Sequence, residues 1–231
     1  MIKLFIFASL SIFEHRMELI LIFALSVLSY LLGSMPTALW VGKAFYGLDI
    51  RFHGSGNSGA TNTFRVLGKK AGTIVLLLDV VKGLTAASLV RYLPFVEMGT
   101  IRFVNLQLLF GLLAVLGHIF PIYAKFKGGK GIATLLGMVI AIHYLSALVC
   151  MLLFLIILFS TRYVSLSSIL SAVAFPIIAV IIYNNQEPLF IAFGIAAALM
   201  VVLTHQKNIV RLVAGNENKA NLLKKHRNRY P

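Results

Sequence analysis

The sequence is poor in acidic residues and in cysteine. Its 231 residues include 7 Asp and Glu against 21 Lys and Arg, and only 12% are charged, about half the usual share in soluble domains. Cys150 is the single cysteine, which excludes an intramolecular disulfide and any metal site built from several cysteines. Carboxylates and histidines are not grouped as metal ligands. We therefore expect no metal and no cofactor.

Hydrophobic residues make up 59% of the chain, and no long polar segment interrupts them. One polytopic membrane domain accounts for this composition. A net charge of +14 could suggest nucleic acid as a partner. The basic residues lie, however, in short segments between apolar runs, where they are typical of topology determinants and of a surface for anionic lipid or substrate. We expect no nucleic-acid partner.

Hydropathy predicts an all-α polytopic membrane protein with about seven transmembrane helices. The expected spans are 18–42, 72–91, 103–122, two short helices within 131–160 that meet at His143-Tyr144, 165–183 and 188–204. Residues 1–16 form an apolar extension to which no function is assigned. Residues 17–215 form the transmembrane domain, and residues 216–231 form a basic tail.

The distribution of Lys and Arg predicts the orientation of these spans. With the amino terminus outside, sixteen of the 21 Lys and Arg fall on one face of the membrane. By the positive-inside rule, that face is cytoplasmic. The carboxyl terminus and the polar motifs described next are then expected on the cytoplasmic side.

The first motif is Gly54-Ser-Gly-Asn-Ser-Gly-Ala-Thr-Asn62, with Arg65 following. Backbone amides exposed by glycine, and the amino end of a helix, bind anions. Ser, Thr and Asn add short donors without adding negative charge. An ordinary flexible turn between two membrane helices is the alternative.

The second motif, Gly128-Gly-Lys-Gly131, opens an apolar run. It resembles a phosphate loop in composition, but it lacks the Ser or Thr that follows the lysine of a Walker A motif. Nucleotide binding by that route is disfavoured. Either Lys130 supplies a charge for an anion, or the segment is a membrane anchor with a flexible hinge.

The third motif is His205-Gln-Lys-Asn208-Ile-Val-Arg211, where the last span ends. An interfacial histidine can also be a capping residue. Asp79 and Lys82 are spaced i, i+3 within a span, so they should pair or face a polar cavity. His118 is expected to be structural. Together the three motifs favour a phosphorylated substrate bound beside the bilayer.

These motifs, in this order and spacing, resemble those of the bacterial membrane acyl-phosphate:glycerol-3-phosphate acyltransferase family. The likeness covers about residues 17–215. It implies a monomeric, multi-pass enzyme of the bacterial inner membrane that faces the cytoplasm. The enzyme would transfer a fatty acyl group from acyl phosphate to the sn-1 hydroxyl of glycerol 3-phosphate, giving lysophosphatidate and phosphate for phospholipid synthesis.

The resemblance also assigns roles to residues of this chain. Catalytic roles are implied for Ser55, Arg65, His205 and Asn208. Substrate binding is implied for Gly54, Gly56, Asn57, Gly59, Thr61, Asn62, Gly128, Gly129, Lys130, Gly131, Ser165 and Arg211. The proton acceptor is left open between His205 and a phosphate oxygen of the substrate.

Other functions remain as alternatives. None of the histidines is followed five residues later by Asp, which excludes the acyltransferase class with a His-x4-Asp motif. Acyl thioesters could still replace acyl phosphate as the donor. A membrane transporter of a phosphorylated solute is the main alternative, although inverted repeats with paired interrupted spans are missing. A lipid-binding scaffold would not need the glycine motifs.

Overall fold

The structure is a computed structural model that describes residues 2–183 and 187–220. Within these residues there are helices, turns and loops, and no strand. The helices are α1 (Ile2–Ser34), α2 (Thr37–Tyr46), η1 (Ile50–Phe52), α3 (Ala60–Leu67), α4 (Lys69–Ser88), η2 (Leu89–Tyr92), α5 (Ile101–Ile119), η3 (Ile122–Ala124), α6 (Ile132–Ile142), α7 (Tyr144–Thr161), α8 (Val164–Tyr183), α9 (Pro188–Thr204) and α10 (Gln206–Val213). The expected all-α class is confirmed for the described residues. Residues 221–231 of the expected basic tail lie outside them.

The expected number of seven spans is not confirmed. Within residues 2–183 and 187–220, five helical segments are long and apolar enough to cross a membrane, and α9 and α10, bent by 64°, make a sixth if the pair is one span. Helix α6 has 11 residues, a length of about 16 Å against a hydrocarbon core of about 30 Å. The two faces of the membrane are not marked by the structure, so the orientation stays a prediction.

Two breaks in the helices have local causes. The first span was expected to continue to residue 42, but α1 ends at Ser34 and α2 begins after Pro36, because proline disfavours a helical conformation in the residue before it. The break between α6 and α7 lies at His143, as expected. There His143 Nδ1 accepts a hydrogen bond from the amide of Ser146 and caps α7.

Helices α4, α5 and α6 pack against one another at the centre of the bundle, and α7, α8 and α9 pack beside them. Close packing of α4 on α6 requires two glycines. A Cβ atom at Gly83 would lie 2.0 Å from the carbonyl oxygen of Thr134, and one at Gly137 would lie 1.9 Å from that of Val80. Small residues of this kind let membrane helices approach closely. The pair α4 and α6 thereby forms the rigid support of the loops at one end.

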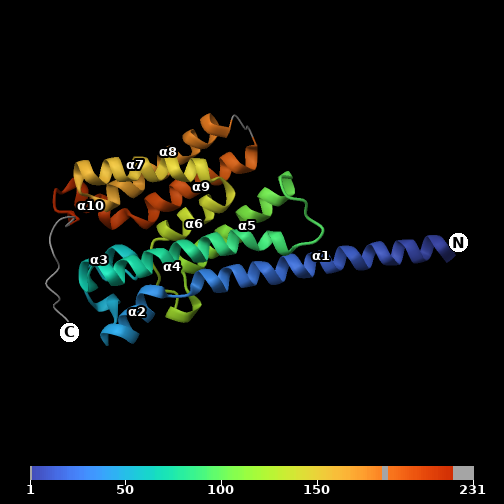
Figure 1. The fold of residues 1–231 in the computed structure, drawn as a ribbon, viewed down its shortest axis with the longest axis horizontal. Coiled ribbons are helices and arrows are strands. Elements are labelled where there is room, and N and C mark those ends of the chain that lie inside the picture. The colour runs from blue at the N-terminus through green and yellow to red at the C-terminus, as the bar shows by residue number, and fades with distance from the viewer. Residues whose placement is uncertain (1, 184–186, 221–231) are drawn as a thin grey trace.

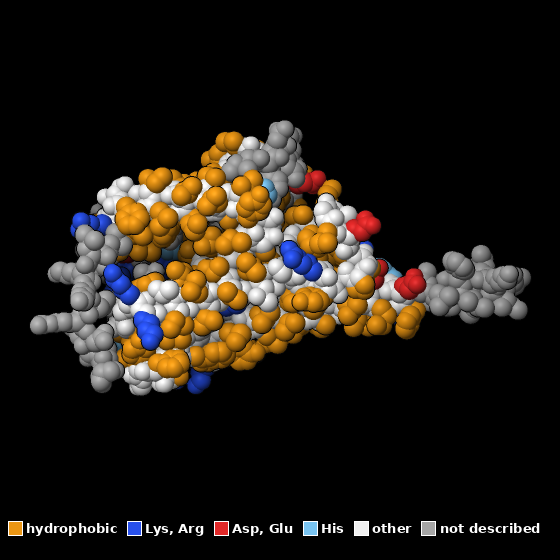
Figure 2. Space-filling model, in the orientation of Figure 1, with side chains coloured by type: hydrophobic (Ala, Val, Ile, Leu, Met, Phe, Trp, Pro, Cys, Tyr) orange, Lys and Arg blue, Asp and Glu red, His pale blue; other side chains and the backbone are white. Residues whose placement is uncertain are grey.

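On the face drawn in Figure 2, hydrophobic side chains are spread along the whole length of the bundle. Phe23, Ile156 and Leu203 are each more than 60% exposed, which is unfavourable in water and is the rule against lipid. In Figure 1, α3 and α10 lie at the end of the bundle opposite to the labelled amino terminus. Most of the visible Lys and Arg gather toward that same end (Figure 2). The polar motifs therefore share one end of the molecule.

Candidate active site

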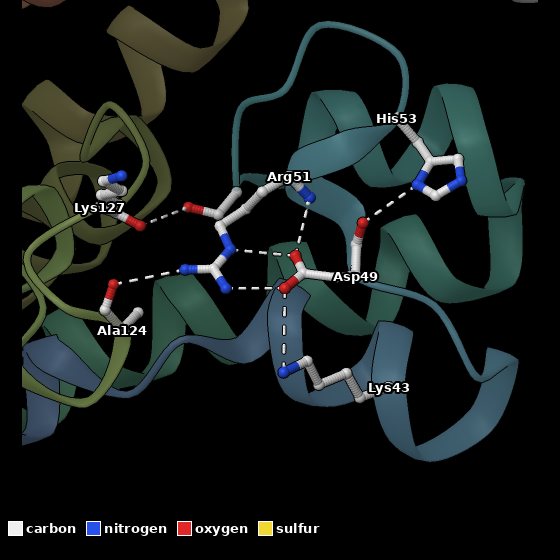
Figure 3. A network of polar contacts seen from close by, with 7 residues as sticks. Lys43, Asp49, Arg51, His53, Ala124 and Lys127 are labelled. Carbon is white, nitrogen blue, oxygen red and sulfur yellow. Dashed lines mark hydrogen bonds and ion pairs between the residues drawn. The ribbon is translucent and has the colours of Figure 1, made fainter.

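Hydrogen bonds from Arg51 and Ser58 join the first motif and the residues just before it to the chain that leads into the second motif (Figure 3). The guanidinium of Arg51 donates from Nε to Asp49 Oδ1 at 3.0 Å and from Nη2 to Oδ2 at 2.7 Å. These hydrogen bonds from Arg51 hold the pKa of Asp49 below its usual value. Arg51 Nη1 also donates to the carbonyl oxygen of Ala124 at 3.4 Å. A second link runs from Ser58 Oγ to the carbonyl oxygen of Lys127, also at 3.4 Å.

Asn62 organises the first motif from inside. It is 1% exposed. Its Oδ1 accepts from the amide of Ser55 at 2.8 Å, and its Nδ2 donates to the carbonyl oxygens of Ile50 and His53. Its amide group is thus occupied by the backbone of the loop, which it folds back onto α3. The contact of Asn62 with a substrate stays a prediction, and the contacts that its side chain makes here are with the loop itself.

The amides of Asn57, Ser58 and Gly59 lead into the amino end of α3. Among the described residues none of these three amides donates a hydrogen bond. The first amides of a helix also lack partners within it. Gly54 and Gly56 adopt φ values of +62° and +73°, a region that favours glycine. The amides of Asn57, Ser58 and Gly59 follow these turns and are available to bind an anion, near in sequence to the exposed side chain of Ser55.

The second motif is seated on the carboxyl end of α5. The amide of Gly128 donates to the carbonyl oxygen of Ile119 at 3.2 Å, and that of Gly129 donates to the carbonyl oxygen of His118 at 3.1 Å. These bonds satisfy carbonyl groups that a helix end leaves without partners. The two amides are then not free to bind a phosphate. The need for glycine is instead steric, because a Cβ at Gly128 would lie 2.0 Å from the His118 carbonyl oxygen.

The third motif meets Lys130 directly. Lys130 Nζ donates to Asn208 Oδ1, and Asn208 Nδ2 donates to Glu217 Oε1 at 2.7 Å. Ser165 Oγ donates to the same oxygen at 3.0 Å, while Arg211 Nε donates to Oε2 at 2.7 Å. Ser165 of α8 and Asn208 and Arg211 of α10 thus converge on one carboxylate, and Asn208 links it to Lys130 of the loop before α6.

Glu217 is the residue that the sequence analysis missed. Its side chain is 5% exposed, although it lies in the segment expected to be a basic tail. Gly215, at φ +70°, turns the chain after α10, and the amide of Ala220 donates to the carbonyl oxygen of Arg162. The available signal was a lone acidic residue directly after a turn that follows His205, Asn208 and Arg211.

The electrostatics of the cluster are those of a crowded cationic site. Burial lowers the pKa of Lys130 to about 8, an effect that Glu217 opposes and that Arg211 and Arg65 reinforce. Burial also lowers the pKa of Arg65, again opposed by Glu217. For Glu217, burial raises the pKa, but hydrogen bonds from Arg211, Asn208 and Ser165 outweigh it and keep the carboxylate ionised.

His205 lies in the bend between α9 and α10 and is 3% exposed. Its Nδ1 lies 2.8 Å from the carbonyl oxygen of Val201, so a neutral ring carries its proton on Nδ1. That tautomer leaves the lone pair on Nε2. Electrostatic interactions link the ring to Lys130 and Glu217. A neutral His205 could therefore accept a proton through Nε2 beside the cluster.

The predicted site residues thus divide into two groups. Contacts or electrostatic interactions join Arg65, Lys130, Ser165, His205, Asn208 and Arg211 around Glu217. Ser55 belongs to the neighbouring loop, and no described contact joins it to Lys130 or His205. The loop residues Gly54, Gly56, Asn57, Gly59, Thr61 and Asn62 surround it in sequence, and Gly131 caps α6.

The fold and the cluster together define an integral membrane protein with a cationic site at one end of a helical bundle, suited to a phosphate-bearing ligand. The family model for glycerol-3-phosphate acyltransferase matches residues 23–215. A glycerol-3-phosphate acyltransferase from Bacillus cytotoxicus is 45% identical over 205 residues, which are 89% of this chain and 98% of that protein. The chain belongs to the glycerol-3-phosphate acyltransferase family, whose enzymes act in phospholipid biosynthesis.

Solved structures resemble the chain as well. The crystal structure of PlsY (YgiH), an integral membrane glycerol 3-phosphate acyltransferase, in its glycerol 3-phosphate form, matches with a TM-score of 0.78 and 35% identity over 87% of this chain and 96% of that one. The lysophosphatidic acid form of the same protein gives a TM-score of 0.75 and 34% identity, with the same coverage. The expected family and the integral membrane fold are therefore confirmed.

Proposed function

We propose that the chain transfers a fatty acyl group from acyl phosphate to the sn-1 hydroxyl of glycerol 3-phosphate. The observation that carries this proposal is the convergence of Lys130, Arg211 and Arg65 on one small polar cluster. PlsY, which shares the fold, has been crystallised with glycerol 3-phosphate and with lysophosphatidic acid. These are a substrate and the product of the proposed reaction.

The charge of the cluster supports a phosphomonoester as the ligand. Three cationic side chains, Lys130, Arg65 and Arg211, surround a single ionised carboxylate, that of Glu217, which leaves a net charge of +2. A phosphomonoester carries a charge of about −1.5 to −2 near pH 7. Its dianion would therefore balance the cluster, whereas a neutral polyol would leave two charges without partners.

The first motif would hold the phosphate of the acyl donor. The free amides of Asn57, Ser58 and Gly59 and the hydroxyl of Ser55 are donors suited to anionic oxygens. They are also suited to the oxyanion that develops when the acyl carbonyl is attacked. The links from Arg51 and Ser58 to the second loop keep the two substrate positions at a fixed separation.

The chemistry needs little more than this alignment, because acyl phosphate is a mixed anhydride. The sn-1 hydroxyl oxygen attacks the acyl carbonyl carbon and forms an ester bond. The bond between that carbon and the phosphate oxygen breaks, and phosphate leaves with the bonding electron pair. The hydroxyl proton passes either to Nε2 of His205 or to a phosphate oxygen. No redox step or metal is needed for the atoms to balance.

The proposed location is the bacterial inner membrane with the site facing the cytoplasm. The site lies at the end of the bundle where Lys and Arg gather (Figure 2), and such residues favour the cytoplasmic side. There the lipid leaflet can receive an acyl chain while the polar substrate arrives from water. A single chain supplies every residue of the cluster, which suits a monomer.

A product assay with alternative donors tests the proposal. Purified protein in detergent receives glycerol 3-phosphate with acyl phosphate, acyl coenzyme A or acyl carrier protein thioester, without added metal, and products are measured by mass spectrometry. We expect 1-acyl-glycerol 3-phosphate with acyl phosphate alone. Turnover with a thioester but not with acyl phosphate would overturn the donor assignment. Uptake of glycerol 3-phosphate into liposomes, with no acylation, would support a transporter.

A further inference from the structure

A second polar cluster lies in the interior of the bundle, beneath the second motif (residues 128–131), which we call the glycine loop. Asp79 of α4 accepts a hydrogen bond from Thr37 Oγ1 at 2.7 Å and forms an ion pair with Lys82 Nζ at 2.8 Å. Lys82 Nζ also donates to the carbonyl oxygen of Met35 at 3.1 Å. Asp79 is 1% exposed and Lys82 is 6% exposed. The expected pairing of these two charges is confirmed, and it ties α4 to the break between α1 and α2.

His118 extends this cluster to two more helices. Its Nδ1 lies 3.2 Å from Thr134 Oγ1 and 3.6 Å from Asp79 Oδ1. The His118 ring is 6% exposed and Thr134 is fully buried. One imidazole on α5 is therefore oriented by a hydroxyl on α6 and a carboxylate on α4. Polar groups are expensive in a membrane interior, so a cluster that only packed these helices could be replaced by apolar side chains without loss.

The glycine loop lies directly on this imidazole. A Cβ atom at Gly129 would lie 2.2 Å from His118 Nε2, so the backbone of the loop packs directly against the ring. The amide of Gly129 donates to the carbonyl oxygen of the same histidine. Lys130, the next residue, donates to Asn208 in the cationic cluster. Before the glycines, Lys125 and Phe126 have φ values of +54° and +58°, a strained conformation that persists only where surrounding contacts impose it.

We infer that His118 is a positioning residue, held in place by Thr134 and the Asp79–Lys82 pair. By packing against Gly129 it fixes the position of the glycine loop relative to α5, and so the position of the Lys130 ammonium. This inference rests on the proposed function in one respect, namely that Lys130 binds the phosphate of glycerol 3-phosphate. His118 does not touch substrate. Its effect passes through Gly129 to Lys130, and it should appear in the binding of glycerol 3-phosphate rather than in chemistry at the acyl group.

Substitutions at Thr134 test the inference without removing the ring. Thr134→Val is nearly isosteric and removes the hydroxyl that orients His118, whereas Thr134→Ser retains it. Ser146→Ala is the matched control, because Ser146 Oγ is also a buried hydroxyl paired with a histidine, His143, at the opposite end of α6. We expect Thr134→Val to raise KM for glycerol 3-phosphate about tenfold, with kcat within about twofold. Thr134→Ser and Ser146→Ala should match the wild type.

A second measurement does not depend on the reaction. A nitroxide spin label is attached at Lys127→Cys in a Cys150→Ala background, and its mobility is read by electron paramagnetic resonance. Thr134→Val should increase the mobility of the label, and Thr134→Ser should not. If the wild type fails to make the proposed product, the proposed function fails while the spin label still decides the positioning role. Unchanged KM together with unchanged mobility in Thr134→Val would overturn the inference.

A double-mutant cycle covers the case in which Thr134→Val does not fold. Gly129→Ala should impair glycerol 3-phosphate binding through its clash with the ring, and His118→Asn removes the ring atoms that cause this clash. The inference requires that the double variant bind better than Gly129→Ala alone. Losses that simply add, or a uniform fall of kcat, affinity and thermal stability in every variant, would show that the cluster only supports folding.

Discussion

The pKa of Lys130 makes the affinity for glycerol 3-phosphate dependent on pH in a direction that can be worked out. Burial lowers this pKa to about 8, so that about 90% of the lysine is charged at pH 7 and about 10% at pH 9. A neutral amine leaves the cluster with a net charge of about +1, too little to balance a phosphate dianion. Because kcat/KM reports groups of the free enzyme, it should fall about tenfold per pH unit above pH 8.

Bound substrate should shift this dependence. A phosphate dianion beside Lys130 favours its charged form and raises its pKa, so kcat at saturating glycerol 3-phosphate should begin to fall at a higher pH than kcat/KM. Glu217 also raises this pKa. Glu217→Gln should therefore move the fall in kcat/KM to a lower pH than in the wild type.

The assay is initial-rate acylation between pH 6 and pH 9.5, with acyl phosphate held constant and its spontaneous hydrolysis subtracted from enzyme-free controls. Lys130→Arg is the diagnostic variant, because a guanidinium stays charged throughout this range. It should remove the alkaline fall in kcat/KM, even though its altered geometry lowers the plateau. A wild-type profile that stays flat to pH 9.5, or an alkaline fall that persists in Lys130→Arg, would refute the assignment of this pKa to substrate binding.

Three further predictions concern single residues. Glu217→Ala removes the acceptor of Ser165, Asn208 and Arg211 and should lower the free energy of unfolding by about 1–3 kcal/mol together with activity; a thermal unfolding midpoint equal to that of the wild type would contradict this. Gly128→Ala places a Cβ 2.0 Å from the His118 carbonyl oxygen and should lower kcat/KM more than about tenfold. Gly99→Ala controls for destabilisation away from the site, because φ at Gly99 is +83° but no atom lies within 4 Å of the new Cβ; it should lower stability and change kcat/KM little. His205→Ala should lower kcat by about 100-fold or more if Nε2 accepts the proton, and near-normal turnover would assign that role to a phosphate oxygen.

The sequence by itself determined the class of the protein and most of its helices. Long uncharged runs can be accommodated in a membrane only as helices, because lipid offers no partners for backbone amides and carbonyls. The break at His143 and the second, third, sixth and seventh expected spans follow from this rule to within a few residues. Pro36 indicates a helix break, but the hydropathy remains high after it, so the predicted first span continued to residue 42 instead of ending with α1 at Ser34. Of the residues around Glu217, local pattern singled out Arg65, Lys130, His205, Asn208 and Arg211, since each is a polar group at the margin of an apolar run. Ser165 came only from the family resemblance.

Only the tertiary structure decided what those polar groups do to one another. Hydrogen bonds of the Gly128 and Gly129 amides go to α5, and the side chain of Asn62 folds its own loop, because the choice between a substrate and a neighbouring carbonyl depends on distances that no local pattern contains. The position of Glu217 depends on a turn at Gly215 and on contacts with α8 and α10. A charge becomes part of a site when chain segments far apart in sequence bring opposite charges to it, and this is a property of packing.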